Sequence, residues 1–163
     1  MQQRRRRFEE GEIQGVDIRE LEKHVDERGW LAELWRTDQI ATRHRPVMSY
    51  LSKTGPGVVR GPHEHEEQTD HFCFLGPANF KVYLWDNRPG SPTYNHRRTF
   101  VVGADKPRAV IIPNGVVHGY KNVSHIPGWI INCPDELYMG EKYSEPVDEI
   151  RHEEDPDSPF KIE

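Results

Sequence analysis

A chain of 163 residues with 34% hydrophobic residues is long enough for one domain with a buried core. Its formal net charge of -5 offers no overall positive field to nucleic acid, and no apolar run reaches membrane-spanning length. We therefore expect no nucleic-acid partner and no membrane, and a cytoplasmic location because no apolar signal segment follows the first arginines. Residues 1–14 are predicted to form a flexible basic tail, and residues 15–163 the domain.

Short segments rich in β-branched and aromatic residues follow one another along the chain, with Gly, Pro and Asn turns between them. Helical spacing is confined to two short stretches, 19–27 and 37–45. Cys73 and Cys133 stand in apolar contexts and are expected to be reduced core thiols. The pattern predicts an all-β sandwich or barrel of the jelly-roll type. The expected strands are 30–36, 47–52, 57–60, 71–75, 80–85, 97–102, 108–113, 116–123 and 128–133.

Histidines gather in two places, RGPHEHEEQTDHFCFL (60–75) and PNGVVHGYKN (113–122). On a strand, residues two apart point to the same face, so His63 and His65 are predicted to face one interior. His118 reaches it from a second strand after a Pro-Gly turn. The acidic residues Glu64, Glu66 and Glu67 are expected to face solvent.

The spacings Gly57-x5-His63-x-His65 and Pro113-x-Gly115-x2-His118-x3-Asn122 resemble the two motifs of the cupin superfamily. This resemblance implies a single-domain cupin double-stranded β-helix, a jelly-roll barrel. Several imidazoles suit a divalent transition metal such as Zn, Ni, Fe or Mn. A site without metal is the alternative expectation. The candidate metal ligands are His63, His65, His71 and His118.

Four longer segments are similar to one branch, the dTDP-4-dehydrorhamnose 3,5-epimerases: DERGWLAELW (26–35), GVVRGPH (57–63), DNRPGSPTY (86–94) and IPNGVVHGY (112–120). The resemblance implies a metal-free enzyme that removes a proton next to the ketone of a nucleotide-linked 4-keto-deoxysugar. The family's base matches His63, and its phosphate-binding arginine matches Arg60. Arg28 and Glu33 match residues that reach a nucleotide in the neighbouring subunit, which implies a homodimer.

Other positions depart from this family's pattern. His71 stands where the family has an enolate-stabilising lysine, and Ile131 where it has a proton-donating tyrosine. Met48 and Tyr50 replace a glutamine and an asparagine that lie near the thymine in the family. The aspartate that pairs with the family's base is expected to fall beyond residue 163. Tyr120 and Tyr138 are alternative proton donors. The candidate catalytic residues are thus His63, His71 and Tyr138, and the candidate substrate-binding residues are Arg60, Arg28, Glu33 and His118.

Three hypotheses follow from these residues. The first is an epimerase or isomerase of a nucleotide-linked keto sugar, with His63 as the base. The second is a metal-dependent cupin with another reaction, such as a sugar ketoisomerase, a lyase or a dioxygenase. The third is a ligand-binding cupin without catalysis. A fold alone does not separate them, because one barrel hosts many functions.

Overall fold

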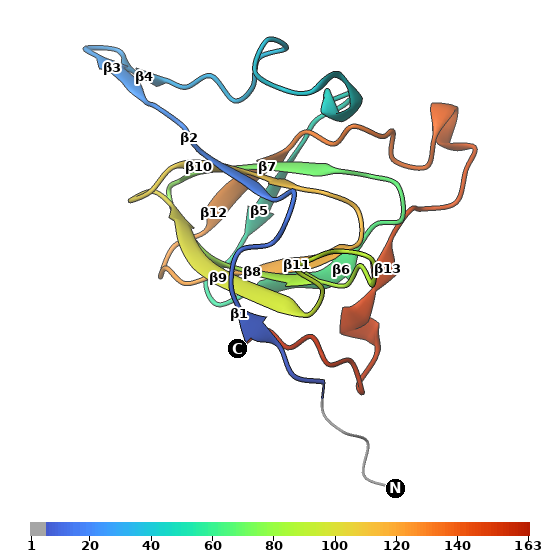
Figure 1. Ribbon diagram of the computed structural model, residues 1–163. Coiled ribbons are helices and arrows are strands. Elements are labelled where there is room, and N and C mark those ends of the chain that lie inside the picture. Colours follow the sequence, from blue (N-terminus) through green and yellow to red (C-terminus); the bar gives the residue numbers. More distant parts are fainter. Residues whose placement is uncertain (1–5) are drawn as a thin grey trace, which may run out of the picture.

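The computed structural model describes residues 6–163, and in it two β-sheets face each other across one core (Figure 1). Sheet A has the strand order β1-β9-β8-β11-β6-β13, and sheet B has the order β2-β10-β7-β12-β5. Sheet A consists of β1 (Glu9–Glu10), β9 (His96–Gly103), β8 (Asn79–Asp86), β11 (Val116–Asn122), β6 (Val59–Glu64) and β13 (Ile150–Arg151). Sheet B consists of β2 (Asp17–Glu20), β10 (Arg108–Ile112), β7 (Asp70–Gly76), β12 (Gly128–Asn132) and β5 (Tyr50–Thr54).

Neighbouring strands are antiparallel, except that β1 pairs parallel with β9. The all-β jelly-roll expectation is confirmed. Of the expected strands, only 30–36 is largely wrong, because the hairpin strand β4 (Gly29–Leu31), paired with β3 (His24–Asp26), ends near its start. No helix in residues 6–163 is long and apolar enough to cross a membrane.

The two stretches with helical spacing do not form α-helices. Within 19–27 the chain continues β2 and then forms β3, while 37–45 holds only the 3-10 helix Thr42–His44. Pairing of β2 with β10 and burial of Leu21 against Cys73 and Ala109 outweigh the weak local preference. Two further 3-10 helices lie near the C-terminus, Glu141–Tyr143 and His152–Glu154.

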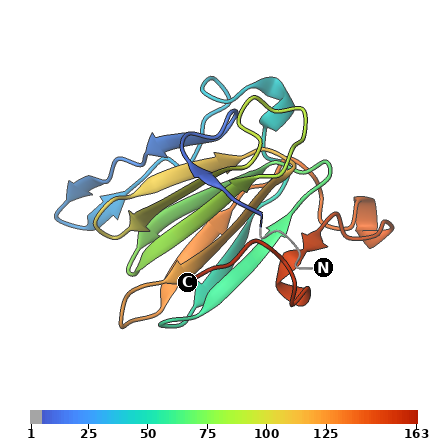
Figure 2. The ribbon, with the colours of Figure 1, turned by 60° about the horizontal axis from the view of Figure 1, so that its bottom comes forward.

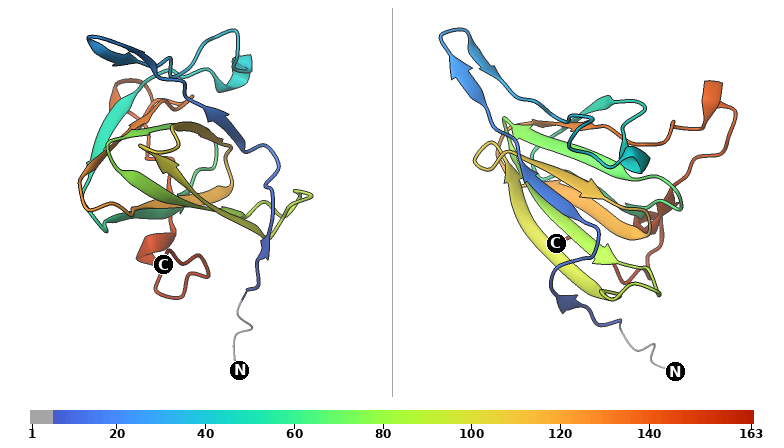
Figure 3. Two further views of the ribbon diagram at one scale, coloured as in Figure 1. Left: turned by 90° about the vertical axis from the view of Figure 1, so that its left-hand side faces the viewer. Right: turned by 45° about the horizontal axis from the view of Figure 1, so that its top comes forward.

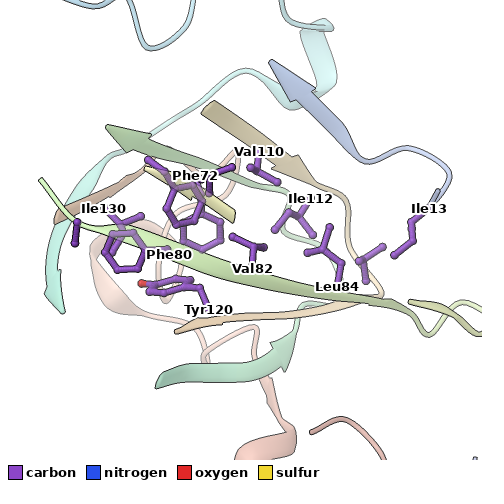
Figure 4. Packing of buried hydrophobic residues seen from close by; sticks show 13 residues of the cluster. Ile13, Phe72, Phe80, Val82, Leu84, Val110, Ile112, Tyr120 and Ile130 are labelled. Carbon is purple, nitrogen blue, oxygen red and sulfur yellow. The ribbon is translucent and has the colours of Figure 1, made fainter. Parts of the chain in front are cut away.

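The core lies between the sheets and is dominated by aromatic rings. Phe72 and Phe74 from sheet B meet Phe80 and Tyr120 from sheet A, with ring centroids 5.7 to 6.1 Å apart and mostly tilted or edge-to-face geometry (Figure 4). Aliphatic side chains fill the space toward the other end, among them Leu84. Side chains on the inner faces alternate with outward ones, which decides which residues can enter the site.

The described part of the predicted N-terminal tail, residues 6–14, packs against the barrel. Residues 1–5 lie outside the described part, but Phe8 packs on Trp85 and Ile13, 3% exposed, closes one end of the core. Strand β1 is added to the edge of sheet A beside β9. Apolar burial and backbone pairing therefore hold this segment on the barrel, against the expectation of a tail over residues 1–14.

The C-terminal segment crosses the outer face of sheet A (Figure 2). Phe160 is buried there against Trp85, and Tyr83 Oη donates a hydrogen bond to the Glu163 carbonyl at 2.6 Å. Upstream, β13 pairs with the end of β6, placing Arg151 opposite His63. This return of the chain brings residues of the 134–151 segment to the mouth of the barrel.

We predict that Phe80→Ala lowers the free energy of unfolding by about 3–5 kcal/mol, because it leaves a cavity among tightly packed rings. Val101, 47% exposed on β9, offers the control, and Val101→Ala is expected to change it by less than about 1 kcal/mol. Urea unfolding followed by tryptophan fluorescence measures both. Equal losses in the two variants would contradict this description of the core.

Candidate active site

Three histidines meet at the inner face of sheet A, two from its strands and His65 from the loop after β6. His63 on β6 and His118 on β11 are register partners, with ring centroids 4.5 Å apart, and the His65 ring lies 5.5 Å from that of His63. Gly61 allows this approach: its φ is +81°, and a Cβ there would sit 2.7 Å from the His118 carbonyl oxygen. The structure thus brings together imidazoles from two separated sequence segments.

A buried carboxylate, Asp70 at the start of β7, faces these rings from sheet B. Its Oδ2 lies 2.9 Å from His118 Nε2 and 3.1 Å from His65 Nε2. Its Oδ1 accepts hydrogen bonds from Asn132 Nδ2 at 2.7 Å and Gln68 Nε2 at 2.8 Å. Burial opposes the charge, but the contacts with His118 and His65 outweigh it and hold the pKa of Asp70 well below its usual range.

The His118 ring is held between a backbone carbonyl and the Asp70 carboxylate. Its Nδ1 lies 2.9 Å from the Val116 carbonyl oxygen, which only accepts, so Nδ1 carries a proton. Nε2 then faces Asp70 Oδ2 at ion-pair distance, yet within the described part of the chain neither buried atom has a well-aligned hydrogen bond. A second proton on Nε2 or a shared cation relieves the repulsion between a ring lone pair and the carboxylate. His63, His65, Asp70 and His118 each offer one ligand atom, all within 4.8 Å of one another.

The expected base, His63, is accompanied by a carboxylate. Its Nδ1 lies 3.5 Å from Glu149 Oε1, and each side chain is 17% exposed. Burial, reinforced by His118, lowers the pKa of His63 to about 2, so the ring is neutral at pH 7. The family resemblance predicts a partner for the base beyond residue 163, but in the structure Glu149 takes this position. Only the pairing of β13 with β6 reveals it.

His65 is fastened by the same C-terminal segment. Its Nδ1 contacts the Asp148 backbone carbonyl, and the Asp148 carboxylate accepts hydrogen bonds from the backbone N–H groups of residues 66, 67 and 68. Burial opposes protonation of His65, but its contact with Asp70 outweighs burial and raises the pKa to about 9. His65 is therefore charged at pH 7, beside a neutral His63.

His71 does not join the cluster, contrary to both the catalytic and the metal expectations. On β7, Asp70 and Phe72 face inward, so His71 points to the outer face of sheet B. There it is 3% exposed and lines a separate cavity of about 190 Å³ with Arg19 and Gln39. Neither ring nitrogen has a hydrogen-bond partner among residues 6–163. The carboxylate of Asp70, not His71, takes the expected fourth position.

The other predicted site residues lie in two separate parts of the molecule, a large cleft and the region of the β3–β4 hairpin. Arg60 and Tyr138 line a cleft of about 1430 Å³ together with His63 and His65. Arg28 does not: it lies on the β3–β4 hairpin with 84% of its side chain exposed, and Glu33 pairs with Arg36 beside the smaller cavity. This hairpin projects away from the barrel (Figure 3).

Two minor expectations concern the cysteines and the acidic residues near the site. Cys73 and Cys133 are buried free thiols, as expected. Glu66 and Glu67 are exposed, but Glu64 is not: it is 6% exposed and accepts hydrogen bonds from Asn87 Nδ2 and His152 Nε2. Strand alternation turns it away from the site, and the C-terminal segment then covers it.

Known proteins agree with this architecture. A model of the dTDP-4-dehydrorhamnose 3,5-epimerase family matches residues 10–146. The chain belongs to this family. Membership confirms the resemblance seen in the four sequence segments and makes the protein an enzyme of the sugar-epimerase class.

Individual relatives support this assignment. The probable low-salt glycan biosynthesis epimerase Agl13 of Haloferax volcanii is 40% identical over 139 residues, covering 84% of this chain and 86% of the relative. The spore coat polysaccharide biosynthesis protein SpsL of Bacillus subtilis is 39% identical over 119 residues, covering 73% and 78%. NovW, a 4-keto-6-deoxy sugar epimerase from Streptomyces spheroides, is 26% identical, with a TM-score of 0.74 and coverage of 95% and 78%.

The position of His71 makes stability depend on pH. Burial, reinforced by Arg19, lowers the pKa of His71 from 6.5 to about 4, so between these values the unfolded chain binds more protons than the folded one. The contribution of the neutral ring is complete above pH 6.5 and lost as pH falls toward 4, by at most roughly 3 kcal/mol.

We expect His71→Phe to lose less unfolding free energy than the wild type between pH 7 and pH 4, as measured by urea unfolding at several pH values. The exposed His125 is the control, and His125→Gln is expected to keep the wild-type pH dependence. If both variants follow the wild type, His71 is not buried as a neutral ring.

Proposed function

We propose that the protein epimerises a nucleotide-linked 4-keto-deoxysugar in carbohydrate biosynthesis, by removing a proton next to the ketone and returning one from the other side. The observation that carries this proposal is the neutral His63 beside Glu149 in a cleft of about 1430 Å³. NovW is described as a 4-keto-6-deoxy sugar epimerase, and Agl13 as a probable glycan biosynthesis epimerase. These names favour epimerisation over a lyase, a dioxygenase or a binding protein without catalysis.

His63 acts as the base in this proposal. With Nδ1 turned toward Glu149, its Nε2 remains to take the proton from the carbon next to the ketone. The imidazolium that forms is stabilised by the Glu149 carboxylate, which also fixes the orientation of the ring. A lowered pKa makes the neutral base abundant at pH 7.

The enolate and the nucleotide each require positive charge. His65, whose pKa is raised to about 9, supplies charge near the developing enolate oxygen, the task that a lysine performs in the family pattern. Arg60 is held by Thr54 Oγ1 and the Lys53 carbonyl at the cleft wall and is assigned to the diphosphate. The cleft is large enough for a sugar with its nucleotide.

The proposal predicts deuterium incorporation from D2O at C3 or C5 of dTDP-4-keto-6-deoxyglucose, followed by NMR or mass spectrometry. His63→Gln is expected to lower the exchange rate by about 100-fold or more, because it removes the base. His71→Gln is the matched control and is expected to exchange at the wild-type rate. Absence of wild-type exchange, with or without added divalent metal, would rule out the proposal.

A second candidate function rests on the buried atoms Asp70 Oδ2 and His118 Nε2, which lie 2.9 Å apart but form no well-aligned hydrogen bond with any residue of 6–163. Together with His63 and His65 they fit one divalent transition metal, Zn, Ni, Fe or Mn, because imidazole and carboxylate suit all of these ions. A bound metal would supply Lewis acidity toward a sugar carbonyl, as in a metal-dependent sugar ketoisomerase. His65, which is charged at pH 7, would then give up its Nε2 proton to bind the ion.

Metal uptake separates the two candidates. For the metal-dependent enzyme, wild-type protein dialysed against Zn²⁺ and then against buffer is expected to retain about one equivalent by elemental analysis. His118→Gln loses the metal, whereas His71→Gln keeps it because that ring faces the other side of sheet B. Less than about a tenth of an equivalent in the wild type would dismiss the second candidate.

We also propose that the protein acts as a homodimer in the cytoplasm. The β3–β4 hairpin exposes Val25, Trp30 and Leu31, and exposed apolar groups of this kind favour a protein interface. Arg28 lies on the same hairpin, outside the cleft of its own chain. These features support delivery of Arg28, with Glu33, to the nucleotide of a second copy.

A further inference from the structure

The proposed epimerisation needs a proton donor opposite His63. At the position where the family resemblance places a proton-donating tyrosine, this chain has Ile131. Ile131 on β12 packs with Leu21 and Cys73 on the outer face of sheet B, away from the cleft. The inward position of β12 is Asn132, which is fully buried. Neither side chain has a proton to give to carbon, so the donor must come from another strand.

Asn132 is hydrogen-bonded to the phenol of Tyr50 on the neighbouring strand. Asn132 is the register partner of Tyr50 on β5, and its Nδ2 donates a hydrogen bond to Tyr50 Oη at 2.9 Å. The same amide nitrogen donates to Asp70 Oδ1 at 2.7 Å, so the carboxylate fixes the amide that fixes the phenol. Because Tyr50 Oη accepts this bond, its own proton is free for another partner.

Tyr50 lies on the side of the large cleft opposite His63. Tyr50 and His63 both line the large cleft, the former from sheet B and the latter from sheet A. A substrate between the sheets therefore presents one face to the imidazole and the other to the phenol. Inversion at carbon needs removal and return of the proton on opposite faces.

Two other phenols line the cleft but fit the role less well. Tyr120 is 6% exposed and sits among Phe72, Phe74 and Phe80 in the core. Tyr138, 50% exposed, is about as open as Tyr50 at 45%, but it lies on the 134–149 loop, where its backbone N–H donates to Met48 Sδ. A strand with a fixed hydrogen-bond partner holds a catalytic group more precisely than a loop.

We infer that Tyr50 is the catalytic acid of the proposed epimerisation, donating its phenolic proton to the face of the enolate opposite His63. This inference rests on the proposed function. The C–H bond to His63 breaks, leaving an enolate and an imidazolium. A new C–H bond then forms with the Tyr50 proton as the phenolic O–H breaks. The phenolate regains a proton from water and His63 releases one, so the enzyme is restored.

The surroundings of Tyr50 keep its proton in place until it is needed. Tyr50 is 45% exposed to the cleft as a whole residue, but partial burial of its phenol, with the nearby charge of Asp70 adding to it, raises its pKa above the ordinary value. The phenol is thus protonated throughout the neutral range and acts as a donor rather than a second base. A carbanion-like enolate is basic enough to take the proton from such a group.

The test uses full-length Tyr50→Phe with dTDP-4-keto-6-deoxyglucose in D2O. Epimer formation is expected to fall by about 100-fold, while deuterium exchange at the same carbon falls by less than about 10-fold. His63 still removes the proton in this variant, and deuterium returns on the original face. Exchange without inversion is a result that a merely structural role of Tyr50 does not produce.

Controls make each outcome decisive. Tyr94→Phe removes a phenol outside the cleft and is expected to keep both rates, and thermal unfolding checks that Tyr50→Phe is folded. Wild-type epimer formation in Tyr50→Phe, equal loss of exchange and inversion, or loss of inversion in Tyr138→Phe instead would each overturn the assignment while leaving epimerisation intact. A wild-type enzyme without any exchange would remove the proposed function and this assignment together.

Discussion

The carboxylate of Asp70 connects the two walls of the barrel. From sheet A it receives His118 and, from the loop after β6, His65, and from sheet B it receives Asn132. A fully buried charge is costly unless several partners compensate it, so this carboxylate requires the imidazoles and the amide to stay where they are. The charge of His65, the register of β12 and the position of Tyr50 all follow from that requirement.

Strand alternation then determines which of two neighbouring residues points into the site and which points to the outer face of the sheet. Along β7, Asp70 enters the site and His71 leaves it, and along β12 Asn132 enters and Ile131 leaves. A shift of β7 by one residue would turn the carboxylate out of the site, and a shift of β12 alone would put an isoleucine beside it. The aromatic core below the site, with Phe72 next to the His118 ring, makes such a shift expensive because every inward side chain would change.

Much of this arrangement could be predicted from the sequence. The segment 57–65 and the segment 113–122 specify the strands and the turn that place His63, His65 and His118 together, since local spacing determines which face a strand residue occupies. Glu149 and Tyr50 could not be found in this way. Their roles depend on which strands become neighbours, β13 beside β6 and β5 beside β12, and no short motif records a pairing between distant segments.

The prediction that His71 enters the site was wrong for a related reason. Matching by order along the chain placed His71 at the family's lysine, but a match in order carries no information about the face of the strand. Once Asp70 is inward, the neighbouring imidazole has to be outward. In the proposed site the carboxylate beside the base is Glu149 from the C-terminal segment, and the proton donor is Tyr50 from β5. The same chemical groups can therefore be supplied by different strands. What has to be preserved is the direction in which each group points into the cleft, and the pairing of the sheets controls that direction.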